Sequence, residues 1–166
     1  SDQARDVTIT WSPNGGTRTV TLTGGIATNV DLTGLAADQA YQYTVTSSGA
    51  TSVTGRFRTA RPRGASYRVV MQADSHLDEN SDLDIYKRTL TNVLTDQGDF
   101  HVDLGDTFMV DKYLKFTDAA PQYLAQRYYF GLVGHSAPVF LVLGNHDGEQ
   151  PARGGSGADS MAVWSN

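Results

Sequence analysis

The chain has 166 residues, enough for one ordinary domain or two small ones, and 39% of them are hydrophobic and 19% charged. This composition excludes a disordered tail or a collagen-like chain, and the absence of cysteine excludes a disulfide scaffold, a thiolate metal site and a cysteine nucleophile. No apolar run is long enough to span a membrane, and the net charge of -5 argues against a large nucleic-acid-binding surface.

The acidic excess lies entirely in the second part of the chain. Residues 1–60 hold four acidic and four basic residues, whereas residues 61–166 hold fourteen acidic and nine basic residues. A solvated acidic surface explains this distribution, and so does a set of carboxylates gathered around cations. Charge alone leaves both explanations open.

Residues 1–60 contain no Glu, no Lys and no helical periodicity, and their apolar and polar residues alternate. Turn signals rich in Gly, Pro and Asn separate the alternating runs about every 8–12 residues, which favours a small all-β sandwich. The expected strands cover residues 7–11, 17–22, 28–32, 41–46 and 52–59.

The same segment carries three sequence features of a known module: VTITW at 7–11, LTGL at 32–35 and YQYTV at 41–45. With these features it resembles a fibronectin type III-like module. The resemblance implies that Tyr41 forms a tyrosine corner, in which the hydroxyl hydrogen-bonds to nearby backbone. Because five strands are expected where such a sandwich has seven, we expect the module to begin upstream of Ser1. Alternatively, Trp11, Tyr41 and Tyr43 are plain core aromatics.

A Pro/Gly break at residues 61–64 predicts a linker between a first domain, residues 1–60, and a second domain, residues 65–166. In the second domain, apolar runs typical of buried strands alternate with helical patterns. Ser81 is the expected cap of the first helix, and Pro121 fits the first turn of the second. The strand–helix order predicts a parallel sheet covered by helices. Its strands are expected at residues 67–71, 100–104 and 138–143, and its helices at residues 81–94 and 121–130.

Each predicted strand of this second domain ends in a polar cluster: DSH at 74–76, GDT at 105–107 and GNHD at 144–147. In open α/β sheets, ligands bind just beyond the carboxyl ends of the strands. Three parallel strands would therefore bring these clusters to one edge of the sheet. The collected carboxylate, imidazole and amide groups suit Mn, Fe, Zn or Mg better than a thiophilic metal.

The ordered motifs D-x-H, G-D and G-N-H-D resemble the signature of the calcineurin-like metallophosphoesterases. This resemblance implies an α/β catalytic domain of βαβ units that uses two divalent or trivalent metal ions to hydrolyse phosphoric esters. It implies that Asp74 and His76 bind the first metal. Asp106 would bridge both metals, and Asn145 would bind the second through its amide oxygen.

The resemblance also implies a mechanism for a small phosphoester substrate. Metal-bound hydroxide would attack phosphorus between the two cations. His146 would stay off the metals and protonate the leaving alkoxide as the general acid. Asp147 would orient His146.

The chain departs from the purple acid phosphatases, whose two-part layout it shares. His76 stands where they have Gly, and Met109 stands where they have a Tyr ligand, so we expect no tyrosinate–iron site. The family draws further His ligands from a second half, and no His follows Asp147. We therefore expect residues 65–166 to be the N-terminal half of an incomplete catalytic domain that needs its missing half, or a second chain, to complete the site.

Alternatives remain open for each motif. Asp74 and Asp106 alone could be strand-end turn residues, and His101 and His135 match no motif and are interpreted as structural or exposed. The chain as a whole could be a truncated or degenerate remnant that serves as a non-catalytic binding module. A metal-dependent nuclease is disfavoured by the acidic balance. By family analogy the protein is expected to be secreted or periplasmic.

Overall fold

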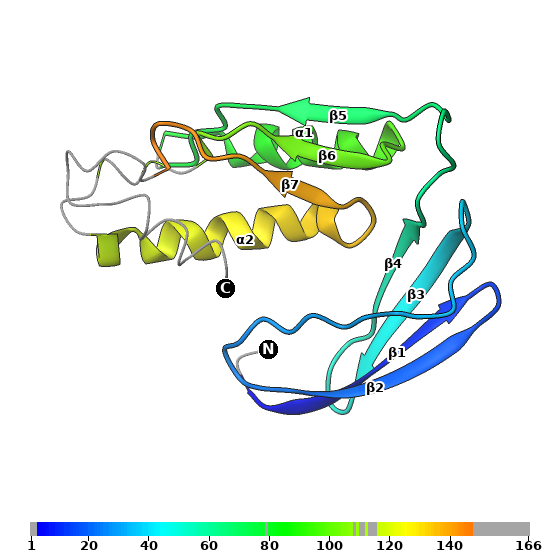
Figure 1. Cartoon of the computed structure of the whole chain (residues 1–166). Coiled ribbons are helices and arrows are strands. Elements are labelled where there is room, and N and C mark those ends of the chain that lie inside the picture. The colour runs from blue at the N-terminus through cyan, green and yellow to red at the C-terminus, as the bar shows by residue number, and fades with distance from the viewer. Residues whose placement is uncertain (1–2, 79, 108, 110–111, 113–115, 148–166) are drawn as a thin grey trace. The chain divides into compact units, whose positions relative to one another are not determined.

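The computed structural model describes residues 3–78, 80–107, 109, 112 and 116–147. The chain divides into two compact units, Ser1–Ser66 and Tyr67–Asn166 (Figure 1). We call them the N-terminal unit and the C-terminal unit. No helix in the described part of the chain is long and apolar enough to cross a membrane.

The N-terminal unit is built on one antiparallel sheet with the strand order β2-β1-β3-β4 (Figure 1). Its strands are β1 (Arg5–Ser12), β2 (Gly16–Leu22), β3 (Ala40–Ser47) and β4 (Val53–Arg58). One face of the sheet is apolar and includes the buried residues Val7 and Tyr41. The opposite face carries threonines in facing positions, such as Thr8 and Thr19, whose hydroxyl oxygens lie 3.0 Å apart.

The Tyr41 hydroxyl accepts a hydrogen bond of 2.9 Å from the backbone N–H of Ala36. This confirms the hydrogen bond to nearby backbone that the sequence predicts for Tyr41. The ring of Tyr41 is buried and stacks on Phe57 with a centroid distance of 5.2 Å. Tyr41 is therefore a core aromatic and also hydrogen-bonds to nearby backbone, so the two alternatives are compatible.

The strand expected at residues 28–32 is wrong, because this segment has no strand partner. Val30 and Leu32 are half-buried and their neighbours are exposed, so the alternation does reflect burial of the side chains on one side of this segment. Alternation records which side chains face inward, whereas a strand also needs a neighbouring backbone to pair with. Within the described residues 3–66 there is one four-stranded sheet and no second sheet of a sandwich.

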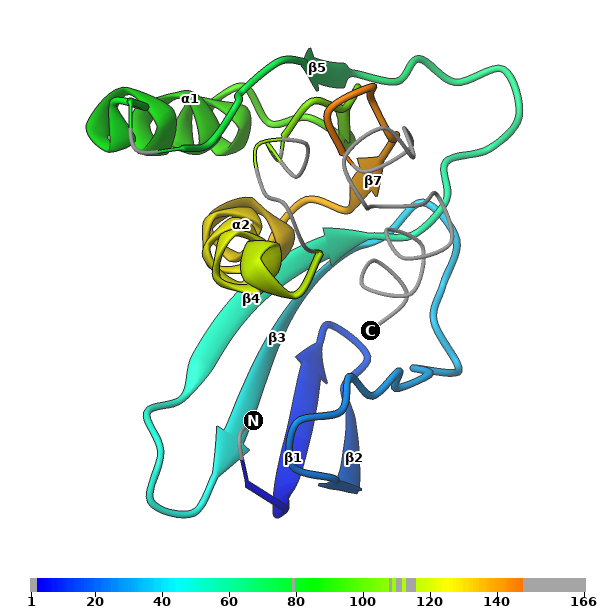
Figure 2. The same cartoon turned by 90° about the vertical axis from the view of Figure 1, so that its left-hand side faces the viewer.

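The C-terminal unit contains the parallel sheet that the sequence predicts, with the order β5-β6-β7 and both pairs parallel. Its strands and helices are β5 (Val69–Gln72), α1 (Leu83–Thr95), β6 (Phe100–Asp103), the 3-10 helix η2 (Phe116–Ala119), α2 (Ala120–Gly134) and β7 (Val139–Leu141). Figure 2 shows both long helices on the same side of the sheet. On the other face, Met71 is 62% exposed and Phe140 is 57% exposed.

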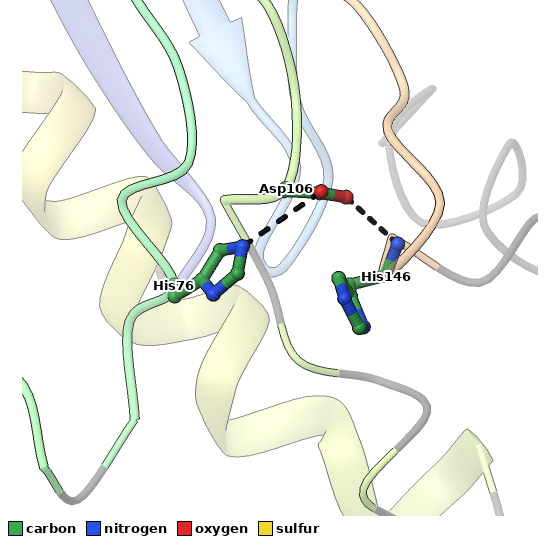
Figure 3. Close-up of side chains that lie close together, drawn as sticks. All are labelled: His76, Asp106 and His146. Atoms are coloured by element: carbon green, nitrogen blue, oxygen red, sulfur yellow. Dashed lines mark hydrogen bonds and ion pairs between the residues drawn. The ribbon is translucent and has the colours of Figure 1, made fainter.

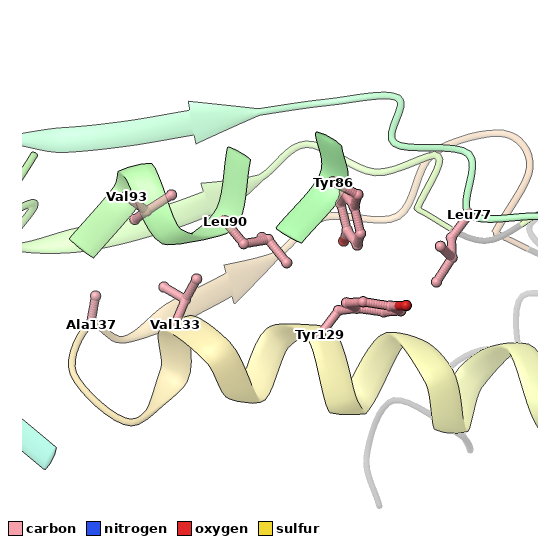
Figure 4. Packing of buried hydrophobic residues seen from close by; sticks show 7 residues of the cluster. All are labelled: Leu77, Tyr86, Leu90, Val93, Tyr129, Val133 and Ala137. Atoms are coloured by element: carbon pink, nitrogen blue, oxygen red, sulfur yellow. The ribbon is translucent and has the colours of Figure 1, made fainter. Parts of the chain in front are cut away.

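The core of this unit lies between the two helices and the helix-facing side of the sheet (Figure 4). Tyr86 of α1 and Tyr129 of α2 meet edge to face, with ring centroids 5.2 Å apart. Leu90 of α1 and Val133 of α2 are fully buried beside them. This apolar contact fixes the strands and helices from which the motif loops emerge.

The sequence predicts Ser81 as the cap of helix α1, but the structure shows that the cap is Asp82. The Asp82 carboxylate accepts hydrogen bonds of 3.0 Å from the N–H groups of Asp84 and Ile85, which a helix start leaves unpaired. Ser81 instead donates its hydroxyl to the carbonyl oxygen of His76 at 2.8 Å. Ser81 therefore supports the loop that carries His76.

Candidate metal centre

The loops that follow β5 and β6 stay paired beyond the ends of their strands. The N–H of Asp74 donates to the carbonyl of Gly105 at 3.0 Å, and the N–H of His76 donates to the carbonyl of Asp106 at 2.9 Å. The backbone ladder of the sheet therefore continues into the motif loops. As a result, His76 and Asp106 lie side by side.

Three motif side chains converge at this edge of the sheet: His76, Asp106 and His146 (Figure 3). Each offers a nitrogen or oxygen atom, and these atoms all lie within 4.8 Å of one another. His76 Nε2 is 3.7 Å from Asp106 Oδ2. The rings of His76 and His146 meet edge to face with centroids 5.2 Å apart. The predicted gathering of the three strand-end motifs is thus seen in these three residues.

The donor atoms of this cluster suit a metal ion. His76 Nε2 is buried and has no hydrogen-bond partner among the described residues. A buried polar atom without a partner is unfavourable, so such atoms usually have a role. Imidazole nitrogen and carboxylate oxygen together are typical ligands of Mn, Fe and Zn. A cation held by His76 and Asp106 would supply the missing partner.

Backbone strain is concentrated at the same place. Asp74, His76 and Asp106 all have a positive φ, at 57°, 43° and 53°, although none of them is glycine. A non-glycine residue in this region costs on the order of 1–3 kcal/mol, and such residues cluster at active sites and ligand clamps. The motif loops therefore hold an arrangement that backbone preference alone would not select.

Two motif glycines allow the loops after β6 and β7 to touch. A Cβ on Gly105 would lie 2.3 Å from the backbone nitrogen of Gly144, and a Cβ on Gly144 would lie 2.3 Å from Asp106 Oδ1. Gly105 also has φ +99°, which disfavours other residues. The sequence predicts the tight turn, and the structure adds close contact between loops as a second reason for glycine.

The carboxylate of Asp147 connects the same two loops by hydrogen bonds. Its side chain is fully buried, and Oδ2 accepts hydrogen bonds of 2.7 Å from the backbone N–H groups of both Asp106 and Gly144. The N–H of His146 in turn donates to Asp106 Oδ1 at 2.7 Å. Through these bonds Asp147 fixes the backbone of Asp106, and the orientation of the His146 ring by Asp147 stays a prediction.

The other two predicted ligands lie at the margin of the cluster. Asp74 Oδ1 is 3.5 Å from His76 Nε2, and the Asp74 side chain is 68% exposed. Asn145, between Gly144 and His146, is also exposed. Their binding to metal stays a prediction. Met109 is buried, and its N–H donates to Gln122 Oε1 at 3.0 Å.

Sequence reasoning overlooked one buried acid beside the centre, Asp103 at the end of β6. Residues 100–103 alternate in burial, which places His101 and Asp103 on the helix-facing side, where both are fully buried. Burial raises the pKa of Asp103 to about 6 and lowers the pKa of His101. The two-residue period of the strand could have revealed both positions. Of the two alternatives for His101, structural or exposed, the structure supports the first.

Comparison with known proteins agrees with this geometry. The model of the calcineurin-like phosphoesterase family (Metallophos) matches residues 67–166, which is more than half of the chain. A solved structure of PhoD resembles the chain with a TM-score of 0.50 and 14% sequence identity. The similarity covers 98% of this chain and 37% of the PhoD chain, and at this identity it supports the fold alone. No curated protein matches the sequence. The chain belongs to the calcineurin-like phosphoesterase family.

Proposed function

We propose that this chain carries the metal-binding face of a dinuclear phosphoric ester hydrolase that acts on a small phosphoester. The observation that carries the proposal is the buried Nε2 of His76, which makes no hydrogen bond and lies 3.7 Å from Asp106 Oδ2 within the three-residue cluster. Membership of a phosphoesterase family supports metal-dependent phosphoester hydrolysis.

We assign the metal ligands as the motifs imply. Asp74 and His76 hold one metal ion, Asp106 bridges to a second, and Asn145 offers its amide oxygen to that second ion. When bound, two such ions supply an activated water and neutralise charge on the phosphoryl oxygens. The strained loops and the Asp147 clamp support this assignment because they hold Asp106 in one place.

His146 is proposed as the general acid that protonates the departing alkoxide. Its ring lies beside His76, and its backbone N–H is anchored on Asp106 Oδ1. This backbone hydrogen bond keeps the His146 ring within the three-residue cluster, beside the proposed metal ligands. A positioned acid of this kind contributes about 10²–10⁴-fold to the rate.

A pair of ions needs more donors than this cluster provides. Because His146 is proposed for proton transfer, His76 and Asp106 are the two residues of the cluster that remain to hold metal. We propose that the remaining ligands come from a further segment of the native protein or from a second chain.

In addition, the Tyr41 hydrogen bond supports a fibronectin type III-like identity for the N-terminal unit.

The experiment that tests the proposal is His146→Asn in the longest natural form of the protein, loaded with Mn²⁺. With β-glycerophosphate, whose alkoxide leaving group needs a proton, the kcat for release of phosphate is expected to fall about 10²–10⁴-fold, while Mn²⁺ affinity stays within about twofold of wild type. His135→Asn is the matched control, because His135 lies outside the cluster and is expected to leave kcat unchanged. Undiminished kcat in His146→Asn would contradict the proposed role of His146.

A further inference from the structure

Asp103 is a fully buried carboxylate that none of the sequence motifs includes. It ends β6, three residues before Asp106. Its Oδ2 accepts a hydrogen bond of 2.7 Å from Gln72 Nε2, and its Oδ1 accepts one of 3.1 Å from the N–H of Gly105. The carboxylate therefore lies against the turn that delivers Asp106 to the metal centre.

The surroundings of Asp103 are unfavourable for a negative charge. No Lys, Arg or His forms an ion pair with it among the described residues. Burial, and to a smaller extent the carboxylates of Asp147 and Asp74, raises the pKa of Asp103 to about 6. A buried charge without a cation beside it lowers the stability of a fold.

The two carboxylates that act on Asp103 both belong to the metal centre, which gives a reason for keeping its buried negative charge. Asp74 is a predicted metal ligand, and Asp147 holds the backbone of Asp106. A cation held by Asp106 would lie beyond the turn whose N–H at Gly105 donates to Asp103, three residues away along the chain. In a poorly screened interior, a carboxylate attracts such a cation without touching it.

We infer that Asp103 is a positioning residue of the metal centre, whose buried negative charge strengthens cation binding from outside the ligand set at the expense of fold stability. This inference rests on the proposed function. To hold Gln72 and Gly105, a side chain needs only a hydrogen-bond acceptor, which can be neutral. To attract a cation, it needs the negative charge, so the two roles can be tested separately.

Asp103→Asn in the 166-residue chain removes the negative charge and keeps nearly the same side-chain shape. The Asn Oδ1 still accepts from Gly105, and rotation of the Gln72 amide presents its unpartnered Oε1 to the new NH₂ group. The matched control is Asp84→Asn, which changes the net charge equally but at an 88% exposed side chain on α1. Mn²⁺ affinity is measured by isothermal titration calorimetry, and unfolding of the metal-free protein is measured in urea.

The expected result is a Kd for Mn²⁺ that is about tenfold higher in Asp103→Asn, with a urea midpoint of the metal-free protein equal to or above that of wild type. Asp84→Asn is expected to keep its Kd within twofold of wild type. A structural role alone would lower the urea midpoint and would not give these opposite signs. An Asp103→Asn protein that binds Mn²⁺ like wild type, or that does not fold, overturns the inference. A wild-type chain that takes up no Mn²⁺ overturns the metal centre itself, so the two failures are distinguishable.

Discussion

The two units of this chain differ in where their positive-φ residues and their buried polar residues lie. In the N-terminal unit the positive-φ positions, such as Asn14 and Gly49, lie in exposed turns, and the buried residues are apolar. In the C-terminal unit three non-glycine residues with a positive φ gather in the motif loops. All the buried polar residues of the described chain also belong to this unit: His101, Asp103, Asp106, Thr107, Gln122, Gln126 and Asp147.

This difference separates features that serve folding from features that serve a site. A sequence specifies a fold most simply when local preference, burial and polar pairing agree, as they do in the N-terminal unit. In the C-terminal unit, non-glycine residues with a positive φ and buried carboxylates lie together in and beside the motif loops. Because strain and buried charge lower stability, their concentration around His76, Asp106 and Asp103 points to a functional reason.

The largest expected contrast comes from one glycine in each unit. Gly105→Ala is expected to lower the free energy of unfolding of the C-terminal unit by about 3 kcal/mol or more. The new Cβ would combine a left-handed backbone with contact to backbone atoms of Gly144. Gly49→Ala, with φ +72° and open space around it, is expected to lower the free energy by about 1 kcal/mol. Urea unfolding of each variant measures both values.

Equal losses in the two variants would show that the motif loops have no special packing. Gly105→Ala is also expected to remove Mn²⁺ binding, because the turn presents Asp106 to the cluster. Gly49→Ala should leave Mn²⁺ binding unchanged and is therefore the control for effects of the alanine itself.

A second contrast is the dependence of stability on pH. The unfolded chain releases the Asp103 proton near the ordinary pKa of 3.8, whereas the folded chain holds it up to about pH 6. The folded state binds more protons between these values, so this group lowers stability as pH rises from about 4 to about 6. Two pKa units correspond to about 3 kcal/mol at most. Metal-free wild type and Asp103→Asn are compared by urea unfolding across this range.

The advantage of Asp103→Asn over wild type is expected to grow as pH rises through this window. Buried, neutral His101 acts in the opposite direction, since its lowered pKa makes folding less favourable as pH falls below about 6.5. Because both proteins contain His101, its contribution cancels in the difference. A difference that stays constant from pH 4 to pH 7 would contradict the raised pKa of Asp103.

Much of the C-terminal unit follows from its sequence. Apolar runs with clear ends predicted β5, β6 and β7, and the order of helices and strands predicted that they are parallel. That parallel order is also why residues as distant as His76 and His146 could be placed at one edge in advance. The rule that strand ends meet is independent of the details of packing.

Other features depend on contacts that a single sequence does not record. The alternation at residues 28–32 predicted a strand, but strand pairing depends on which backbone lies beside it. The motif predicts that Asp147 orients the His146 ring, but it does not predict that the buried oxygen also accepts from two backbone N–H groups of different loops. Asp103 carries no motif, and its importance arises from burial and from the carboxylates around it.

The most direct test of the central claim is Mn²⁺ uptake by the 166-residue chain, measured by equilibrium dialysis for wild type and Asp106→Asn. The Asn side chain keeps an oxygen that can accept the N–H of His146, so the loops are retained while the carboxylate ligand is lost. The account predicts that wild type binds Mn²⁺ and that Asp106→Asn loses most of this binding. No uptake by wild type, or equal uptake by both proteins, would contradict a metal centre at His76 and Asp106.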